Sequence, residues 1–135
     1  MFDAFLIPEK TIATAKGDSG PLDVSAAGSA VFLATLTINS VVEQESLEIS
    51  LFTSADGTTW EAKPAALFPQ KFYVGEYPLL VDLSAATGAK FLRAHWEVSR
   101  WGRGPTEPRF EFGLRIREVS REALLEAQAE AQARR

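Results

Sequence analysis

Cysteine is entirely absent from this chain of 135 residues. Without thiols the protein forms no disulfide, holds no metal through thiolate sulfur and has no cysteine nucleophile. Histidine is nearly absent as well, because His95 is the single one. Its position among Arg93 and Glu97 favours a surface or interface residue over a catalytic base or metal ligand, which would need further groups converging on it.

Long apolar runs and strong charge of one sign are also lacking. No window approaches the roughly 18 apolar residues of a membrane-spanning helix, and no basic region followed by an apolar run marks a signal peptide. The formal net charge is only −4, which argues against a general nucleic-acid-binding face. We therefore expect a soluble protein made in the cytoplasm, with no nucleic-acid or membrane partner. Incorporation into a virion or a virion-like particle stays open.

Motifs of the common catalytic and cofactor sites are missing. There is no P-loop, no dinucleotide fingerprint, no G-x-S-x-G elbow and no metal-ligand spacing. Asp18 and Asp56 stand near glycines in expected turns, where an aspartate forms the turn far more commonly than it binds calcium. The sequence therefore predicts no enzyme, no cofactor and no metal site.

The clearest positive signal is the segment from Leu47 to Trp60. Apolar residues alternate with others from Leu47 to Leu51, the period of a strand with one face in a core. The turn chemistry that follows is strong, because Gly57 tolerates a positive φ and Asp56 can bond back to the backbone. The pattern predicts a hairpin in which Trp60 opens the return strand.

Further strands are expected on both sides of this hairpin. Residues 30–38 form an almost continuous apolar run, typical of a central strand. Residues 91–99 and 109–117 alternate between two faces, and shorter β-prone runs cover residues 11–15, 22–25, 71–77 and 79–83. Gly75 in one of these runs indicates a bulge or a close backbone approach. This order predicts an all-β fold, an antiparallel β-sandwich or jelly roll, with a closed barrel as the alternative.

The last residues, SREALLEAQAEAQARR, have a different character. They contain good helix formers without Gly, Pro or β-branched residues, and Ser120 is suited to cap the N-terminus of a helix. Only Leu124 and Leu125 are large and apolar, so a free helix of this length would be marginal and needs a partner surface. We predict a β-sandwich domain over residues 1–119 and a C-terminal α-helix over residues 120–135.

Candidate binding residues gather in the loop after residue 99. Trp101 stands between Arg100 and Arg103, a set that can stack on a ring or anchor an interface. In the structural alternative, Trp101 folds back and caps one end of the sandwich. A protein interface and a glycan or nucleotide site are the functional alternatives. Tyr73 and Tyr77 are weaker candidates of the same kind.

The N-terminal segment carries Phe2 and Phe5, and then Leu6 and Ile7 before a proline. It is either a short edge strand held by its own apolar residues or an arm that packs on a neighbouring subunit.

Two partial resemblances arise from these motifs. The order LEISLFTSADGTTW, KFLRAHW and FEFGLRIRE resembles the discoidin (coagulation-factor C-type) jelly rolls, although the cysteines that often clamp the ends of those domains are missing. From about Asp23 to Ile116 the chain is also similar to small structural proteins of tailed phages and prophages, through DVSAAGSA, TSADGTTW, KFLRAHWEV and PRFEFGL. The first resemblance implies a carbohydrate-binding module and the second a head-decoration or head–tail component. Neither implies a catalytic residue.

Two functions are therefore expected. The first is a non-enzymatic, virion-like assembly protein that forms a homo-oligomer or joins a capsid- or tail-type lattice through its N-terminal arm, its aromatic loops and its C-terminal helix. The second is a carbohydrate-binding sandwich whose glycan would contact Trp101, Arg100, Arg103 and Tyr73.

Overall fold

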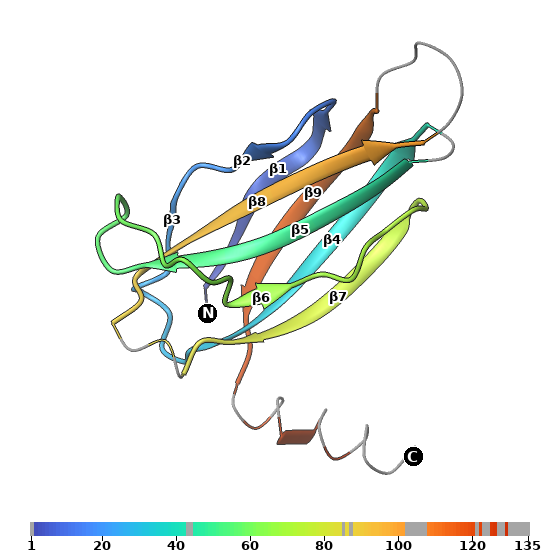
Figure 1. The fold of residues 1–135 in the computed structure, drawn as a ribbon. Coiled ribbons are helices and arrows are strands. Elements are labelled where there is room, and N and C mark those ends of the chain that lie inside the picture. Colours follow the sequence, from blue (N-terminus) through green and yellow to red (C-terminus); the bar gives the residue numbers. More distant parts are fainter. Residues whose placement is uncertain are drawn as a thin grey trace.

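Two antiparallel sheets pack face to face in the computed structural model, which describes residues 2–42, 45–84, 86, 88–101, 108–120, 122, 125, 126 and 129 (Figure 1). The first sheet has the order β1 (Asp3–Ala13), β9 (Phe110–Glu118), β4 (Val31–Val41), β7 (Gly75–Asp82). The second has the order β2 (Gly17–Asp18), β8 (Phe91–Arg100), β5 (Glu45–Ser54), β6 (Ala66–Leu67), and β3 (Leu22–Asp23) also pairs with β8. The prediction of an all-β antiparallel sandwich is confirmed.

The core lies between the sheets and is built from residues that alternate along the strands. The inward side chains of β9 are fully buried, whereas Arg115 and Arg117 on the same strand are exposed. On β8, Leu92 and Ala94 are fully buried while Trp96 and Val98 pack against the edge of the core. These two alternating patterns are confirmed, because burying apolar area on one face of each sheet fixes the strand register.

The continuous apolar run also has its expected place. It forms β4, which lies between β9 and β7 and is central in its sheet. Phe32, Leu36 and Ile38 belong to the core and are at most 2% exposed, because alternate residues of a sandwich strand point toward the facing sheet.

The predicted hairpin forms, but its return strand begins later than expected. Gly57 has a φ of +82°, and the Asp56 carboxylate accepts the backbone N–H groups of Thr58 and Thr59 at 2.9 and 2.8 Å. Trp60 does not open the return strand, which is β6. The Trp60 ring instead faces the Arg93 guanidinium of β8 at 4.6 Å. This neighbour comes from a distant part of the chain and could not be read from local turn chemistry.

The N-terminal segment is one long edge strand rather than a short run followed by another. β1 pairs with β9 along its length, with irregularities between Phe5 and Ile7 and between Ile7 and Thr11. Lys10 lies in the second irregularity and has a φ of +60°, an uncommon value for a residue with a side chain. The sequence pattern suggested two separate segments here, residues 1–9 and 11–15, whereas β1 runs through both.

β7 joins the end of the run predicted at 71–77 to most of the run predicted at 79–83, and residues 71–74 lie outside the strand. Gly75 is paired with Ile38 without a register shift, so the expected bulge is wrong. Gly75 has a φ of +157°, which other residues rarely adopt, and a Cβ atom there would also lie 3.2 Å from the Tyr77 hydroxyl oxygen. Both features favour glycine at this position.

The predicted C-terminal helix stays a prediction. Most of residues 121–135, including Leu124, lie outside the described residues. Leu125 is described and is 58% exposed.

Candidate functional site

β8 stops and β7 begins at the same end of the sandwich (Figure 1). Large aromatic and apolar side chains are exposed there. They are Phe72, Tyr73, Val74 and Trp101, which we call the end patch. Tyr73 is 74% exposed, and Val74 and Trp101 are each 57% exposed. Large apolar side chains grouped in this way on a surface commonly mark an interaction site.

The rings of the end patch touch one another. Phe72 meets Trp101 edge to face with ring centroids 5.8 Å apart, and it meets Tyr73 at 6.2 Å. Both separations lie in the favourable range for aromatic pairs. Phe72 therefore joins two segments that are distant in sequence into one contiguous surface.

Backbone bonds hold the loop that carries three of these residues. Lys71 exchanges two backbone hydrogen bonds with Leu47 of β5, at 2.8 and 2.9 Å. The Tyr77 hydroxyl donates to the carbonyl oxygen of Tyr73 at 2.7 Å, and the Lys71 ammonium lies 4.3 Å from the centre of the Tyr77 ring. The loop that carries the patch is thus held in place before binding, so less conformational entropy is lost when a partner binds.

A buried carboxylate organises the backbone at the same end. Glu45 is 1% exposed and accepts the backbone N–H groups of Val42 and Arg109, the latter at 2.7 Å. It thereby ties the end of β4, the start of β5 and the approach to β9. Arg100 is the cross-strand partner of Glu45 and is half-buried.

The structure brings together three of the aromatic residues predicted to form a site. Trp101 and Tyr73 belong to the end patch, and Tyr77 supports it from β7. Trp101 does not fold back to cap the core, because more than half of its surface is exposed. Arg103 lies outside the described residues.

Sequence reasoning missed Phe72 as a member of the site. The available signal was its position beside Tyr73 in a segment that also contains Val74, because three consecutive large side chains cannot all face one core.

Phe2 and Phe5, the two N-terminal candidates, lie in different environments. Phe2 packs edge to face on Phe32 at 6.2 Å, and its backbone N–H donates to the Glu118 carboxylate at 3.1 Å. It is therefore held by this chain's own sandwich. Phe5 is 43% exposed on the outer face of β1.

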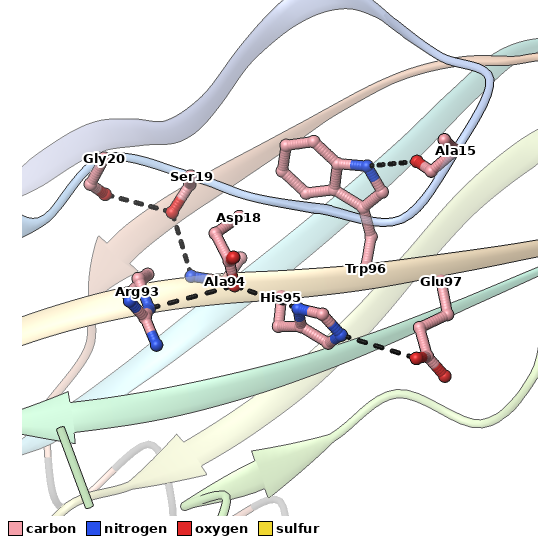
Figure 2. Close-up of polar contacts among 9 residues, drawn as sticks. All are labelled: Ala15, Asp18, Ser19, Gly20, Arg93, Ala94, His95, Trp96 and Glu97. Carbon is pink, nitrogen blue, oxygen red and sulfur yellow. Dashed lines mark hydrogen bonds and ion pairs between the residues drawn. The ribbon is translucent and has the colours of Figure 1, made fainter.

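His95 lies on the outer face of the second sheet between two carboxylates (Figure 2). Its Nδ1 is 2.9 Å from an Asp18 carboxylate oxygen, and its Nε2 is 3.6 Å from a Glu97 carboxylate oxygen. The Arg93 Nε lies 3.9 Å from the same Asp18 oxygen. Both imidazole nitrogens thus face carboxylates on an exposed surface, and no hydroxyl or thiol is bonded to either within the described residues.

Neighbouring bonds show what this charged cluster does. Ser19 and Ala94 exchange hydrogen bonds at 2.8 and 2.9 Å, and the Trp96 indole N–H donates to the Ala15 carbonyl oxygen at 3.2 Å (Figure 2). Together with the contacts of Asp18 to His95 and Arg93, these bonds fasten the segment around β2 across β8. The geometry of the cluster supports a structural role.

The two aspartates considered as calcium ligands have other partners. Asp56 forms the turn after β5, and the N–H donors of Thr59 and Thr58 hold the pKa of its carboxyl far below the usual range. Asp18 lies in a strand, not in the expected turn, and pairs with His95. Among the described residues, no group of three or more His, Cys, Asp or Glu side chains is arranged to hold a metal ion.

Within the described part of the chain, no helix is both long and apolar enough to cross a membrane.

No protein-family model matches this chain, and no curated protein or solved structure is significantly similar to it. Known proteins therefore add no support to either resemblance.

Proposed function

We propose that this chain is a non-enzymatic assembly protein that binds other protein subunits through its end patch. The observation that supports this proposal most directly is the exposed, mutually packed pair of Phe72 and Trp101. Aromatic residues that lose their hydration on binding contribute most of the energy of protein interfaces. A virion-like lattice or decoration layer is the kind of assembly that we propose.

The chemistry of the end patch fits a protein surface better than a sugar. Phe72 and Val74 offer only apolar atoms, and the Tyr77 hydroxyl already donates to Tyr73. The Lys71 ammonium lies over the Tyr77 ring. A sugar needs several free polar groups beside an aromatic platform, whereas a protein interface needs an apolar centre.

The edges of the first sheet disfavour association by strand addition. β1 contains Pro8 beside its irregularities, and β7 contains Pro78. A proline on an edge strand removes a backbone donor and blocks pairing with another chain. Assembly through the end of the sandwich is therefore more consistent with this structure than growth of a sheet.

The positions of the strand ends set the geometry of such an assembly. β9 starts at the end that carries the patch, where Glu45 bonds to Arg109, and it finishes at Glu118 beside Phe2. The predicted C-terminal helix with its exposed Leu125 therefore follows the opposite end. A contact between this segment and the patch of the next copy would be heterologous, which produces rings or filaments.

Sedimentation velocity over a wide concentration range tests the proposal. We expect the wild-type chain to form a species larger than a monomer, and we expect Trp101→Ala or removal of residues 120–135 to shift it toward the monomer. Leu67→Ala is the matched control, because Leu67 is 58% exposed on β6 and outside the patch.

A wild-type chain that stays monomeric at every concentration contradicts self-assembly. A carbohydrate that binds the monomer and loses its binding in Trp101→Ala would establish the alternative function. The 74% exposure of Tyr73 is the observation that favours this alternative.

A further inference from the structure

A groove lined mainly by polar residues crosses the outer face of the first sheet and shares no residue with the end patch. Its volume is about 380 Å³, within the range of small-molecule sites. Residues of all four strands line it, among them Phe5, Glu9, Thr35, Thr37, Asn39 and Glu76.

The groove is created by two backbone features. Gly113 on β9 lies under the irregular part of β1, and a Cβ atom there would be 2.9 Å from the Glu9 Cα and 3.3 Å from the Pro8 carbonyl oxygen. β1 passes over Gly113 at Pro8 and Glu9, and the next residue, Lys10, has a φ of +60°. Backbone strain of this kind costs free energy and persists where the surrounding structure requires it. The strained turn of β1 thus forms one wall above a floor that lacks a side chain at position 113.

The floor of the groove offers unused hydrogen-bonding groups. Thr37 is the cross-strand partner of both Gly113 and Glu76. In the described part of the chain, the side chains of Thr35, Thr37 and Asn39 line the groove with no hydrogen bond of their own. A hydroxyl or amide can both donate and accept, so this floor suits a ligand that carries hydroxyl groups.

The charges around the groove balance one another. Arg115 is held by Asp3, whose carboxylate accepts its Nε at 2.8 Å. Lys10 and Arg117 contribute positive charge to the lining, and Glu9 and Glu76 contribute negative charge. Such a balance gives no net attraction for a phosphate or another strongly anionic ligand.

We propose that this groove binds a small neutral saccharide. The threonines and Asn39 would form hydrogen bonds with its hydroxyl groups, and the two glutamates would accept hydrogen bonds from further hydroxyls. The exposed ring of Phe5 would contact its apolar face. The site is separate from the end patch, so it goes beyond the proposed assembly function.

NMR titration of the full chain tests this site. The probes are maltose, cellobiose, lactose and N,N′-diacetylchitobiose, with inorganic phosphate as the charged comparison. We expect at least one neutral disaccharide to shift the backbone amide signals of Thr37 and Gly113, while phosphate leaves them unchanged.

Variants separate the groove from the end patch. Thr37→Val keeps the shape of the side chain and removes the hydroxyl, and together with Asn39→Ala it should weaken saccharide binding by about tenfold or more. Phe5→Ala should also weaken it. Ser50→Val on the outer face of the second sheet and Trp101→Ala at the end patch should leave it unchanged.

The proposal is overturned if no neutral saccharide shifts the groove amides, or if the groove variants bind as tightly as the wild type. It is also overturned if the shifts map to Tyr73 and Trp101 instead. None of these results affects the sedimentation test of assembly.

Discussion

The Phe72 and Trp101 rings pack in a T-shaped arrangement with their centroids 5.8 Å apart, and the two residues come from different loops of the sandwich. This contact turns isolated exposed side chains into a surface with a defined shape. It exists because backbone pairing between Lys71 and Leu47 places the first loop beside β5, which itself pairs with the end of β8.

The Phe72–Trp101 contact should be measurable as a coupling in stability. In a double-mutant cycle of Phe72→Ala and Trp101→Ala, we expect a coupling of about 0.5–1.5 kcal/mol, the usual range for an aromatic pair. Urea denaturation of the four proteins at a low, monomeric concentration measures it. Strictly additive effects would show that the rings do not interact in solution. Pairing Trp101→Ala with Leu67→Ala supplies a non-contacting control.

Replacing Gly113 should destabilise the sandwich. A Cβ atom at this position would meet the backbone of Glu9 at 2.9 Å, and backbone cannot rotate away as a side chain can. We expect Gly113→Ala to lower the free energy of unfolding by about 1–3 kcal/mol, as overpacking does. Gly20→Ala is the matched control, since nothing lies within 4 Å of its added Cβ. If both variants were as stable as each other, the backbone of β1 could not lie as close to position 113 as the structure shows.

Removing the buried carboxylate of Glu45 should loosen the end that carries the patch. In Glu45→Ala the N–H groups of Val42 and Arg109 lose their acceptor, and we expect a cost of about 1–3 kcal/mol. Glu48→Ala changes an exposed residue of the same strand and should alter stability by no more than about 0.5 kcal/mol. Chemical denaturation compares the two. A neutral effect at Glu45 would mean that water replaces its bonds at no cost.

Glu118 should make stability depend on pH in the acid range. The backbone N–H groups of Phe2 and Ser29 hold the pKa of its carboxyl below the ordinary value of 4.5. Because the folded pKa is the lower one, the stabilisation is complete above the unfolded value and is lost as pH falls through the folded value.

Denaturation curves of the wild type and Glu118→Gln across this range measure that contribution. We expect the difference in stability between the two proteins to shrink as the pH falls. Ser29→Ala keeps both backbone donors and should retain most of the pH dependence. A constant difference at every pH would show that the Glu118 charge is not held by these donors.

Local pattern predicted much of the fold. The alternation along residues 91–99 and 109–117 follows from burying one face of a strand, and it needs no knowledge of partners. The turn around Asp56 also forms from its own neighbours, because carboxylate and donors lie within a few residues. The late start of the return strand and the joining of separate runs into β1 and β7 depended on distant partners, and the expected boundaries were wrong there. Of the two alternatives for Gly75, the bulge is absent from the pairing of β7 with β4.

The candidate site was predictable only as a list of residues. The sequence by itself determined which strands alternate and which loops carry aromatic side chains, since these are properties of neighbouring residues. Only the tertiary structure decided that Phe72 lies against Trp101, that Gly113 lies beneath Glu9 and that Phe2 is held within its own sandwich. Each of these contacts joins residues brought together by sheet pairing, and that long-range register arises only when the whole core is buried.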